Sequence, residues 1–320
     1  MKKKCCMPDN DRGSGEQGPV SLACHWASAT ETDTVIIPGG RPVLGTSRPK
    51  IADDGEELRK WSQLKPFRLG ISAVTNAQFS SFIQATGYKT DAERFGWSFV
   101  FWSDVPSTIS LTRAVAGLEW WRRVEGANWR DINGPGTASN IWHSDHPVVH
   151  VSWNDALAFA DSCGGRLPME AEWEHAARGG LGDIAYPWGE REPDDHDFLP
   201  CNIWQGQFPE HNTGADGYLT TAPAVSFSPN GYGLYNVAGN VWEWTADHFR
   251  IPSLKKEVQK RLKASRGYRV AKGGSFLCHR SYCWRYRIAA RSSNSPDSST
   301  SHMGFRVAFD ITSQPEHDMS

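Results

Sequence analysis

A stretch of low hydrophobic periodicity, residues 180–259, constrains the fold of this chain most strongly. Gly, Pro, Asn and Trp recur through it, and no apolar stripe of helical or strand spacing organises it. A segment this long and irregular persists in a compact domain only when something holds it, such as a metal ion. The 320 residues also include 15 Trp, 30 Gly and 19 Pro, a composition unlike that of a helical bundle. The sequence predicts a turn-rich α+β protein with a large aromatic core.

Charge and hydropathy exclude several classes of partner. The formal net charge is −2, so no overall attraction to nucleic acid or to an acidic membrane follows. No apolar run reaches the length of a membrane-spanning helix, and no apolar stretch follows the basic cluster at Met1–Lys4. We therefore expect a cytoplasmic monomer with neither nucleic acid nor membrane as a partner.

The chain is expected to form one domain with two extensions. Residues 1–32 are polar and aperiodic and are predicted to be a flexible N-terminal arm that carries Cys5 and Cys6. Residues 33–312 form the predicted domain, and residues 313–320 a C-terminal tail. The domain is expected to open with a short strand at Val35–Ile37.

Three helices are predicted inside the domain. The first follows a capping box at Thr75–Gln78 and ends at Gly87. The second begins at Ser152 and runs to Gly164. The third has Pro168 in its first turn and buries a stripe made of Trp173, Ala176 and Ala177. A basic amphipathic segment at Ser253–Ser265 is predicted to be a solvated helix.

The richest candidate site is the segment that contains Cys278 and Cys283. From Tyr282 to Ile288 aromatic and polar residues alternate, which predicts a half-buried strand. On a straight strand two thiols five residues apart would point to opposite faces, whereas a turn at His279–Ser281 would bring them together. Seven cysteines cannot all pair within one chain, and a reducing compartment disfavours structural disulfides.

Two converging thiols are open to several interpretations. Two sulfurs are too few for a structural zinc site but suit Cu(I), and a disulfide or a thiol redox couple is also consistent with them. The neighbouring cations His279, Arg280 and Arg285 would favour thiolates. Ordinary buried cysteines are an equally good interpretation from spacing alone.

Oxygen donors form two further clusters in the irregular region. Asn236–Trp244 combines Asn and Glu side chains with glycine-permitted carbonyls, and Asn202–Ile203 with Asp216–Tyr218 forms a second set. Hard oxygen donors suit Ca²⁺, although turn-forming Asn and Asp side chains that satisfy their own backbone explain the same residues. The histidines of the segment His143–His150 lack a carboxylate frame and are interpreted as structural.

At this level of detail the sequence resembles the formylglycine-generating enzymes, also called sulfatase-modifying factors, over roughly residues 33–310. The shared stretches are Ala73–Phe79, His146–Ala156, Arg166–Glu174, Tyr186–Gly189, Asn202–Gly206, Gly233–Trp244 and Gly304–Arg306. Many of them belong to a wider superfamily that includes iron-dependent sulfoxide synthases and paralogues without the cysteines. The specific part is Cys278–Cys283 followed by Arg291–Ser299, which resembles the active enzymes.

The resemblance implies a single domain of the sulfatase-modifying-factor fold, a variant of the C-type lectin fold with little regular secondary structure. It implies oxidation of the cysteine in a Cys-x-Pro-x-Arg motif of an unfolded sulfatase to Cα-formylglycine, with dioxygen as oxidant. By matching, Cys278 and Cys283 would hold Cu(I), and the residues lining the site would be Ser275, Trp242, His279 and Tyr282. Where other members have an asparagine, this chain has His302, so substrate contacts at that edge are expected to differ.

The same matching implies two structural calcium ions. The ligands of the first would be Asn202, Ile203, Asp216 and Tyr218, and those of the second would be Asn236, Gly239, Val241 and Glu243. Ile203, Tyr218, Gly239 and Val241 would contribute backbone carbonyls. Three other functions stay open from the sequence: a non-heme iron sulfoxide synthase, a lectin-like binding module without catalysis, and a thiol–disulfide oxidoreductase.

Overall fold

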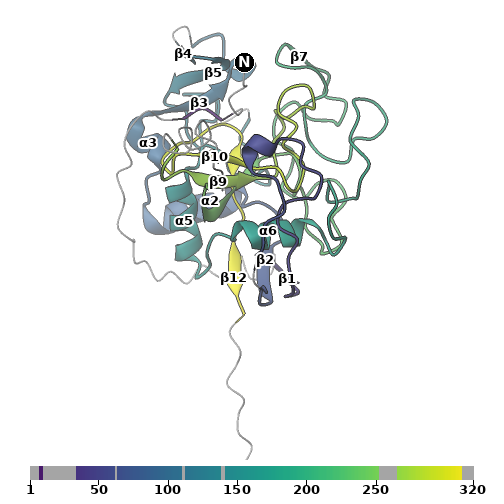
Figure 1. Ribbon diagram of the computed structural model, residues 1–320. Coiled ribbons are helices and arrows are strands. Elements are labelled where there is room, and N and C mark those ends of the chain that lie inside the picture. The colour runs from purple at the N-terminus through teal and green to yellow at the C-terminus, as the bar shows by residue number, and fades with distance from the viewer. Residues whose placement is uncertain are drawn as a thin grey trace, which may run out of the picture.

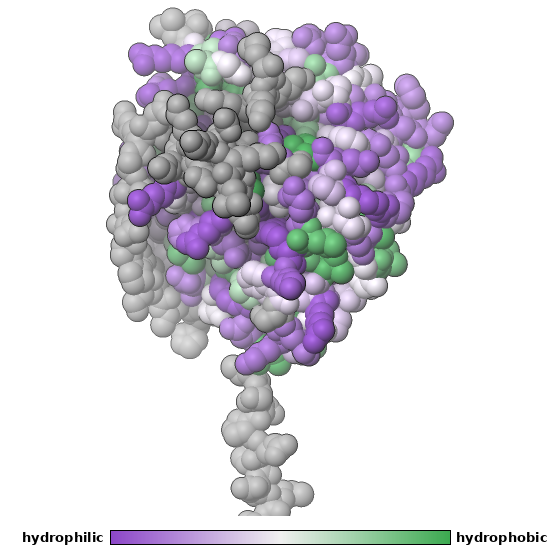
Figure 2. Space-filling view, in the orientation of Figure 1, coloured by the Kyte–Doolittle hydropathy of each residue, from purple (hydrophilic) through white to green (hydrophobic). Residues whose placement is uncertain are grey.

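The computed structural model describes residues 7–9, 34–61, 63–109, 112–137, 141–251 and 265–311. The predicted basic helix lies almost wholly outside these residues, as do most of the predicted arm and the predicted tail. Within the described part, no helix is both long and apolar enough to cross a membrane. The face of the molecule drawn in Figure 2 is largely hydrophilic where it is coloured, with apolar side chains confined to small patches.

Small sheets form the framework of the domain (Figure 1). One sheet has the order β1-β2-β12, with β1 at Thr34–Ile37, β2 at Phe67–Gly70 and β12 at Ala308–Asp310. A second has the order β10-β9-β8-β11, with β10 at Ser292–Asn294, β9 at Arg269–Lys272, β8 at Trp242–His248 and β11 at Met303–Gly304. A third has the order β3-β5-β4, with β3 at Trp97–Phe101, β5 at Leu118–Glu125 and β4 at Arg113–Val115. The hairpin of β6 (Gly206–Gln207) and β7 (His211–Asn212) completes the set.

The three predicted helices are present, with one change at a boundary. Helix α2 spans Asn76–Thr86 and α5 spans Trp153–Ser162, and each begins with the capping box that its sequence predicts. Helix α6 spans Glu170–Ala177, so Pro168 precedes its N-cap and the prediction that this proline occupies the first turn is wrong. A short helix α3 at Asp91–Phe95, and single turns at Ala52–Asp54 and Trp102–Asp104, were not predicted.

Aromatic side chains fill the interior, as the composition predicts. The largest fully buried side chains include five tryptophans: Trp121, Trp129, Trp173, Trp242 and Trp244. The main apolar cluster joins the inner faces of α2 and α5 to strands β8 and β11, and Phe79 stacks on Phe159 with ring centroids 5.9 Å apart. Rigid rings of this size bury a large area each, so few regular elements suffice to make a core.

Asparagine side chains tie down the irregular region that the sequence leaves without periodicity. Asn240 donates to the Ala222 carbonyl at 3.1 Å and accepts from the Ala222 amide at 2.9 Å. Asn230 donates to the last carbonyls of α6, and Asn236 donates to the Pro223 carbonyl at 3.0 Å. Asn236 and Asn240 both have φ in the left-handed region (50° and 60°), which asparagine tolerates better than most residues. These loops are held by local hydrogen bonds even before any ion is considered.

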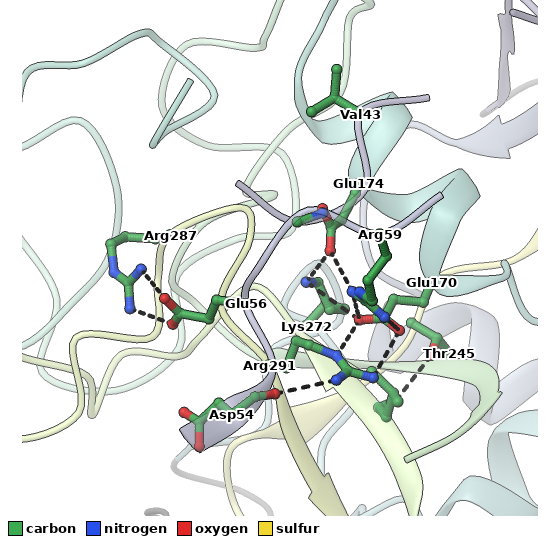
Figure 3. Close-up of polar contacts among 12 residues, drawn as sticks. Val43, Asp54, Glu56, Arg59, Glu170, Glu174, Thr245, Lys272, Arg287 and Arg291 are labelled. Carbon is green, nitrogen blue, oxygen red and sulfur yellow. Dashed lines mark hydrogen bonds and ion pairs between the residues drawn. The ribbon is translucent and has the colours of Figure 1, made fainter. Parts of the chain in front are cut away.

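A buried network of charges joins α6 to the strands beneath it (Figure 3). Glu170 accepts from Arg291 at 2.6 Å and from Arg59 at 2.9 Å, while Glu174 accepts from the Lys272 ammonium at 2.8 Å. Glu174 and Lys272 are fully buried. Because burial of an unpaired charge is costly, each of these side chains depends on its partners to stay in the interior.

Candidate active site

Cys278 and Cys283 converge on one point inside the domain. The Cys278 thiol donates to Cys283 Sγ at 2.9 Å, both residues are at most 1% exposed, and no disulfide joins them. The His279 carbonyl accepts from the amides of Cys283 and Trp284 at 2.9 and 3.0 Å, which closes the turn between the thiols. Of the two arrangements considered from the sequence, the turn is the one that the chain adopts.

The strand predicted over Tyr282–Ile288 is wrong. This segment is a turn followed by a loop, and Trp284 lies in the left-handed region at φ 48°, which no strand residue adopts. Charges rather than a β-ladder hold it: Arg285 pairs with Asp54 at 2.6 Å and Arg287 pairs with Glu56 at 2.6 Å. The alternation of aromatic and charged residues arises because each arginine reaches a carboxylate, Asp54 or Glu56.

The cations near the thiols are themselves engaged with partners. Arg285 donates its Nε proton to Asp54, and His279 lies 3.3 Å from the Asp195 carboxylate and 2.8 Å from the Ser281 hydroxyl. Arg280 is exposed. Of the three residues predicted to favour thiolates, Arg285 and His279 therefore face carboxylates, and Arg280 lies at the surface.

The other predicted site residues surround the cysteine turn. Ser275 is fully buried, and its carbonyl accepts from the Cys278 amide at 2.9 Å. Trp242, fully buried on β8, belongs to the same apolar cluster as both cysteines. Its indole Nε1 has no hydrogen-bond partner among the described residues. Tyr282 is half-buried, and its ring stacks on Phe208 with centroids 4.4 Å apart.

His302 lies at the edge of this site. Its carbonyl accepts from the Trp242 amide at 2.9 Å, its Nδ1 lies 2.5 Å from the Thr300 hydroxyl, and its ring is 4.7 Å from that of Trp121. The residue is completely buried. An imidazole therefore fills the interior here, next to the backbone that positions Trp242.

The first predicted calcium set is brought together and lies directly against the cysteine turn. The Asp216 carboxylate accepts from the Ile203 amide at 3.1 Å and from the Tyr218 amide at 3.0 Å, and burial raises its pKa. Asn202 Oδ1 is buried without a hydrogen-bond partner among the described residues. Trp204, one residue after Ile203, donates its amide to the Cys278 carbonyl at 3.0 Å. An unpaired amide oxygen and a half-buried carboxylate are both donors of the kind that suits Ca²⁺.

The second predicted calcium set is engaged differently. Glu243 accepts from Arg306 through both carboxylate oxygens, at 2.6 and 2.7 Å, and from Trp173 Nε1 at 2.6 Å. Asn236 donates to loop carbonyls, as described above. Gly239 lies so close to the Asn202 carbonyl oxygen that any side chain at position 239 would clash with it. The two predicted sets are therefore in direct contact. Val241 is buried next to them on the way into β8.

Several contributors to the site carry no signal in the sequence. Asp195 lies against His279 of the cysteine turn, and Asp54 and Glu56 pair with the arginines of the loop that follows it. Spacing along the chain gives no indication of these contacts. Phe208 and Trp120 form the aromatic wall around Tyr282, with the Trp120 ring edge-on at 5.0 Å. Trp204 could have been found, because it lies inside one of the shared stretches.

The histidines interpreted as structural are arranged as structural residues. His150 is completely buried, its Nδ1 lies 2.7 Å from the Ser98 hydroxyl, and burial lowers its pKa to about 3. His146 lies 2.9 Å from the Thr221 hydroxyl. In the part of the chain that the structure describes, no group of three or more His, Cys, Asp or Glu side chains is placed to hold a metal ion. A three-histidine iron site is therefore not found among these residues.

A turn-rich domain of small sheets around a buried pair of cysteines that no disulfide joins defines a class, and comparison with known proteins identifies it. A family model described as "Sulfatase-modifying factor enzyme 1-like domain" matches residues 22–311. The chain therefore belongs to the sulfatase-modifying factor family. It is 52% identical over 283 residues to the formylglycine-generating enzyme of Thermomonospora curvata, covering 86% of this chain and 93% of that one.

A mammalian relative and a solved structure extend the comparison. The chain is 45% identical over 324 residues to the formylglycine-generating enzyme of Bos taurus, covering 95% of this chain and 85% of the relative. The structure of PvdO from Pseudomonas aeruginosa matches with a TM-score of 0.59 at 21% identity, covering 93% of this chain and all of that one. At this identity the structural match supports the fold alone. The resemblance to the formylglycine-generating enzymes and the expected single-domain fold are confirmed.

Proposed function

We propose that this chain oxidises the cysteine of a Cys-x-Pro-x-Arg motif in an unfolded sulfatase to Cα-formylglycine, with Cu(I) held by Cys278 and Cys283. The buried, unoxidised pair of thiols on the specific part of the family sequence carries the proposal. Relatives named formylglycine-generating enzyme support the reaction. Dioxygen is the proposed oxidant, and the net change consumes one O₂, two electrons and two protons per cysteine and releases H₂S and H₂O.

The two sulfurs fit the proposed copper ion by the chemistry of the donor set. Soft thiolate ligands select Cu(I), and both sulfurs reach one point without being joined in a disulfide. When bound, Cu(I) would supply a soft centre for a substrate thiolate and the electron-transfer chemistry that dioxygen requires. Both thiols must lose their protons to bind the ion, so copper affinity falls at low pH.

The protein itself positions the two sulfurs and keeps water away from them. The hydrogen bonds that the Cys283 and Trp284 amides donate to the His279 carbonyl fix the separation of the two sulfurs. Ser275 and Trp242 close the interior side, where both are fully buried. Tyr282 and Phe208 present half-buried stacked rings at the outer side, a surface suited to the apolar parts of an unfolded peptide.

We also propose structural calcium at the first set of oxygen donors, and a second ion at the set around Glu243, where Arg306 would share the carboxylate. The unpaired Asn202 oxygen supports the first site more strongly than any feature supports the second. A cytoplasmic location and a monomeric state complete the proposal. None of the four described cysteines is in a disulfide, which fits a reducing compartment.

One experiment tests the reaction against its alternatives. The protein is incubated with Cu(I), a thiol reductant and a peptide bearing Cys-x-Pro-x-Arg, with and without oxygen, and the peptide mass is measured. Loss of mass corresponding to the aldehyde, only when both copper and oxygen are present, is the expected result. A thiol–disulfide oxidoreductase would act without oxygen, an iron enzyme without copper, and a binding module would leave the peptide unchanged.

Removal of calcium is expected to lower both stability and activity. Asn202 and Ile203 stand directly before Trp204, whose amide bonds the Cys278 carbonyl, so loosening the first calcium site displaces the catalytic turn. EGTA should lower the melting temperature, and added Ca²⁺ should restore it, while Mg²⁺ should not because it demands a stricter octahedron. An Asp216→Asn variant should melt at the lower temperature regardless of Ca²⁺. A melting temperature unaffected by EGTA and by this substitution would contradict the first calcium site.

A further inference from the structure

Three residues of the predicted arm are packed into the domain. Met7 is 6% exposed and belongs to the apolar cluster that contains Trp242, Cys278 and Cys283. Pro8 is buried as well, and Asp9 is half-buried. For these residues the expectation of a free arm does not hold, and the burial of a methionine needs an explanation.

The carbonyl of Pro8 occupies a site built from buried donors. It accepts from Asn294 Nδ2 at 2.7 Å and from the Ser298 hydroxyl at 3.1 Å. Both side chains are almost completely buried, and Asn294 also donates to Ser298 at 3.1 Å. Buried donors left without an acceptor are costly, so this pair is a receptor for a peptide carbonyl that enters from another segment.

The receptor is continuous with the candidate active site. The Ser299 carbonyl accepts from the Ser98 hydroxyl at 3.0 Å, and the Ser301 amide donates to the Phe99 carbonyl at 3.0 Å. One residue further, the His302 carbonyl accepts from the Trp242 amide at 2.9 Å. Segment 294–302 therefore runs from the peptide-carbonyl receptor to the tryptophan of the site.

The sequence of the docked segment matches the start of the client motif. Cys6-Met7-Pro8 has the Cys-x-Pro order of Cys-x-Pro-x-Arg, and Asn10 stands where the client has arginine. Cys6 and Asn10 lie outside the described residues. We propose that this N-terminal segment is an intramolecular competitor, in which Met7 and Pro8 occupy the places of the two residues that follow the client cysteine.

The proposal rests on the proposed function and adds a form of regulation to it. A client that carries the full motif has an arginine at its last position, where the chain's own segment has Asn10. The client can therefore gain a charged contact that the internal segment lacks, and displace it. The enzyme would then be blocked at rest and opened by its substrate.

Substitution of Met7 in the full-length chain tests the competition. Met7→Asp places a charge in the apolar pocket and should release the segment, so the KM for a Cys-x-Pro-x-Arg peptide should fall about tenfold with kcat unchanged. Met7→Leu keeps an apolar side chain of similar volume and should behave as the wild type. A KM that is unchanged or raised in Met7→Asp overturns the proposal. If the melting temperature of that variant is lowered at the same time, the segment only stabilises the fold.

A synthetic peptide gives an independent measurement that needs no variant to fold. A peptide with the sequence of residues 5–12, its first cysteine replaced by serine, should inhibit the wild-type protein competitively against the client peptide. A scrambled peptide should not inhibit, and equal inhibition by both would overturn the proposal. If no variant and no wild-type sample forms aldehyde, the proposed function has failed; normal turnover without competition refutes the regulation alone.

Discussion

Aldehyde formation is expected to stop when either Cys278 or Cys283 is replaced by serine, with a loss of about a thousandfold or more. Each sulfur is one of only two soft ligands at the proposed copper site, and a hydroxyl does not replace a thiolate for Cu(I). Both side chains are small and buried, and serine is nearly the same size, so the melting temperature should change little. Turnover of the client peptide and Cu(I) binding, measured by competition with a Cu(I) chelator, should fall together.

Cys163→Ser is the matched control for these variants. Cys163 is also buried, but its thiol donates to the Ala160 carbonyl at 3.2 Å at the end of α5. Burial raises its pKa to about 11, so it stays protonated and is a poor metal ligand. This variant should keep activity and copper binding. Substantial activity in both Cys278→Ser and Cys283→Ser would contradict the assignment of the site.

Loss of the Arg287 side chain is expected to cost about 3–5 kcal/mol of folding free energy, because it leaves a buried carboxylate without its cation. Glu56 is fully buried and accepts two hydrogen bonds from Arg287, at 2.6 and 2.8 Å. Arg287→Met keeps most of the length of the side chain and removes the charge. Because the pair anchors the loop after Cys283, activity at a temperature where the variant is still folded should also fall.

The pH dependence of unfolding distinguishes this ion pair from ordinary packing. Burial alone would raise the pKa of Glu56, but the hydrogen bonds and charge of Arg287 outweigh it and hold the pKa below its usual range. The pair therefore contributes its full stability above about pH 4.5, the range of an unfolded glutamate, and loses it as the pH falls further. Arg287→Met should be less sensitive to acid than the wild type over that interval. Arg48→Met, which breaks the exposed pair of Arg48 with Glu190, is the control and should leave the unfolding midpoint unchanged. An equal loss of stability in Arg287→Met and Arg48→Met would contradict this role of the buried pair.

Local signals predicted the helices well and the loop after Cys283 badly. Thr75 and Ser152 are N-caps because their side chains accept hydrogen bonds from the backbone amides three residues later. This signal depends only on neighbouring residues, so the sequence reveals it. The segment after Cys283 alternates like a strand, but its arginines are spaced to reach Asp54 and Glu56, more than 200 residues away in the sequence. Spacing within a segment cannot reveal partners of that kind. The spacing of the cysteines and the resemblance to the family both indicated Cys278 and Cys283, and the contacts that position them are visible only in the fold.

The pairing of β2 with β12 has a consequence for the synthesis of this protein. Phe67–Leu69, near the start of the domain, pair with Ala308–Asp310 as strand partners. Glu56 likewise forms its ion pair with Arg287, which is synthesised much later. Contacts between such distant parts of a chain form slowly, and here they cannot form until almost the whole domain has left the ribosome. The carboxylates and thiols that become buried in the folded domain therefore stay exposed in the nascent chain until translation is nearly complete. Truncation at residue 300 should yield an insoluble product, since it removes both β11 and β12 from their sheets.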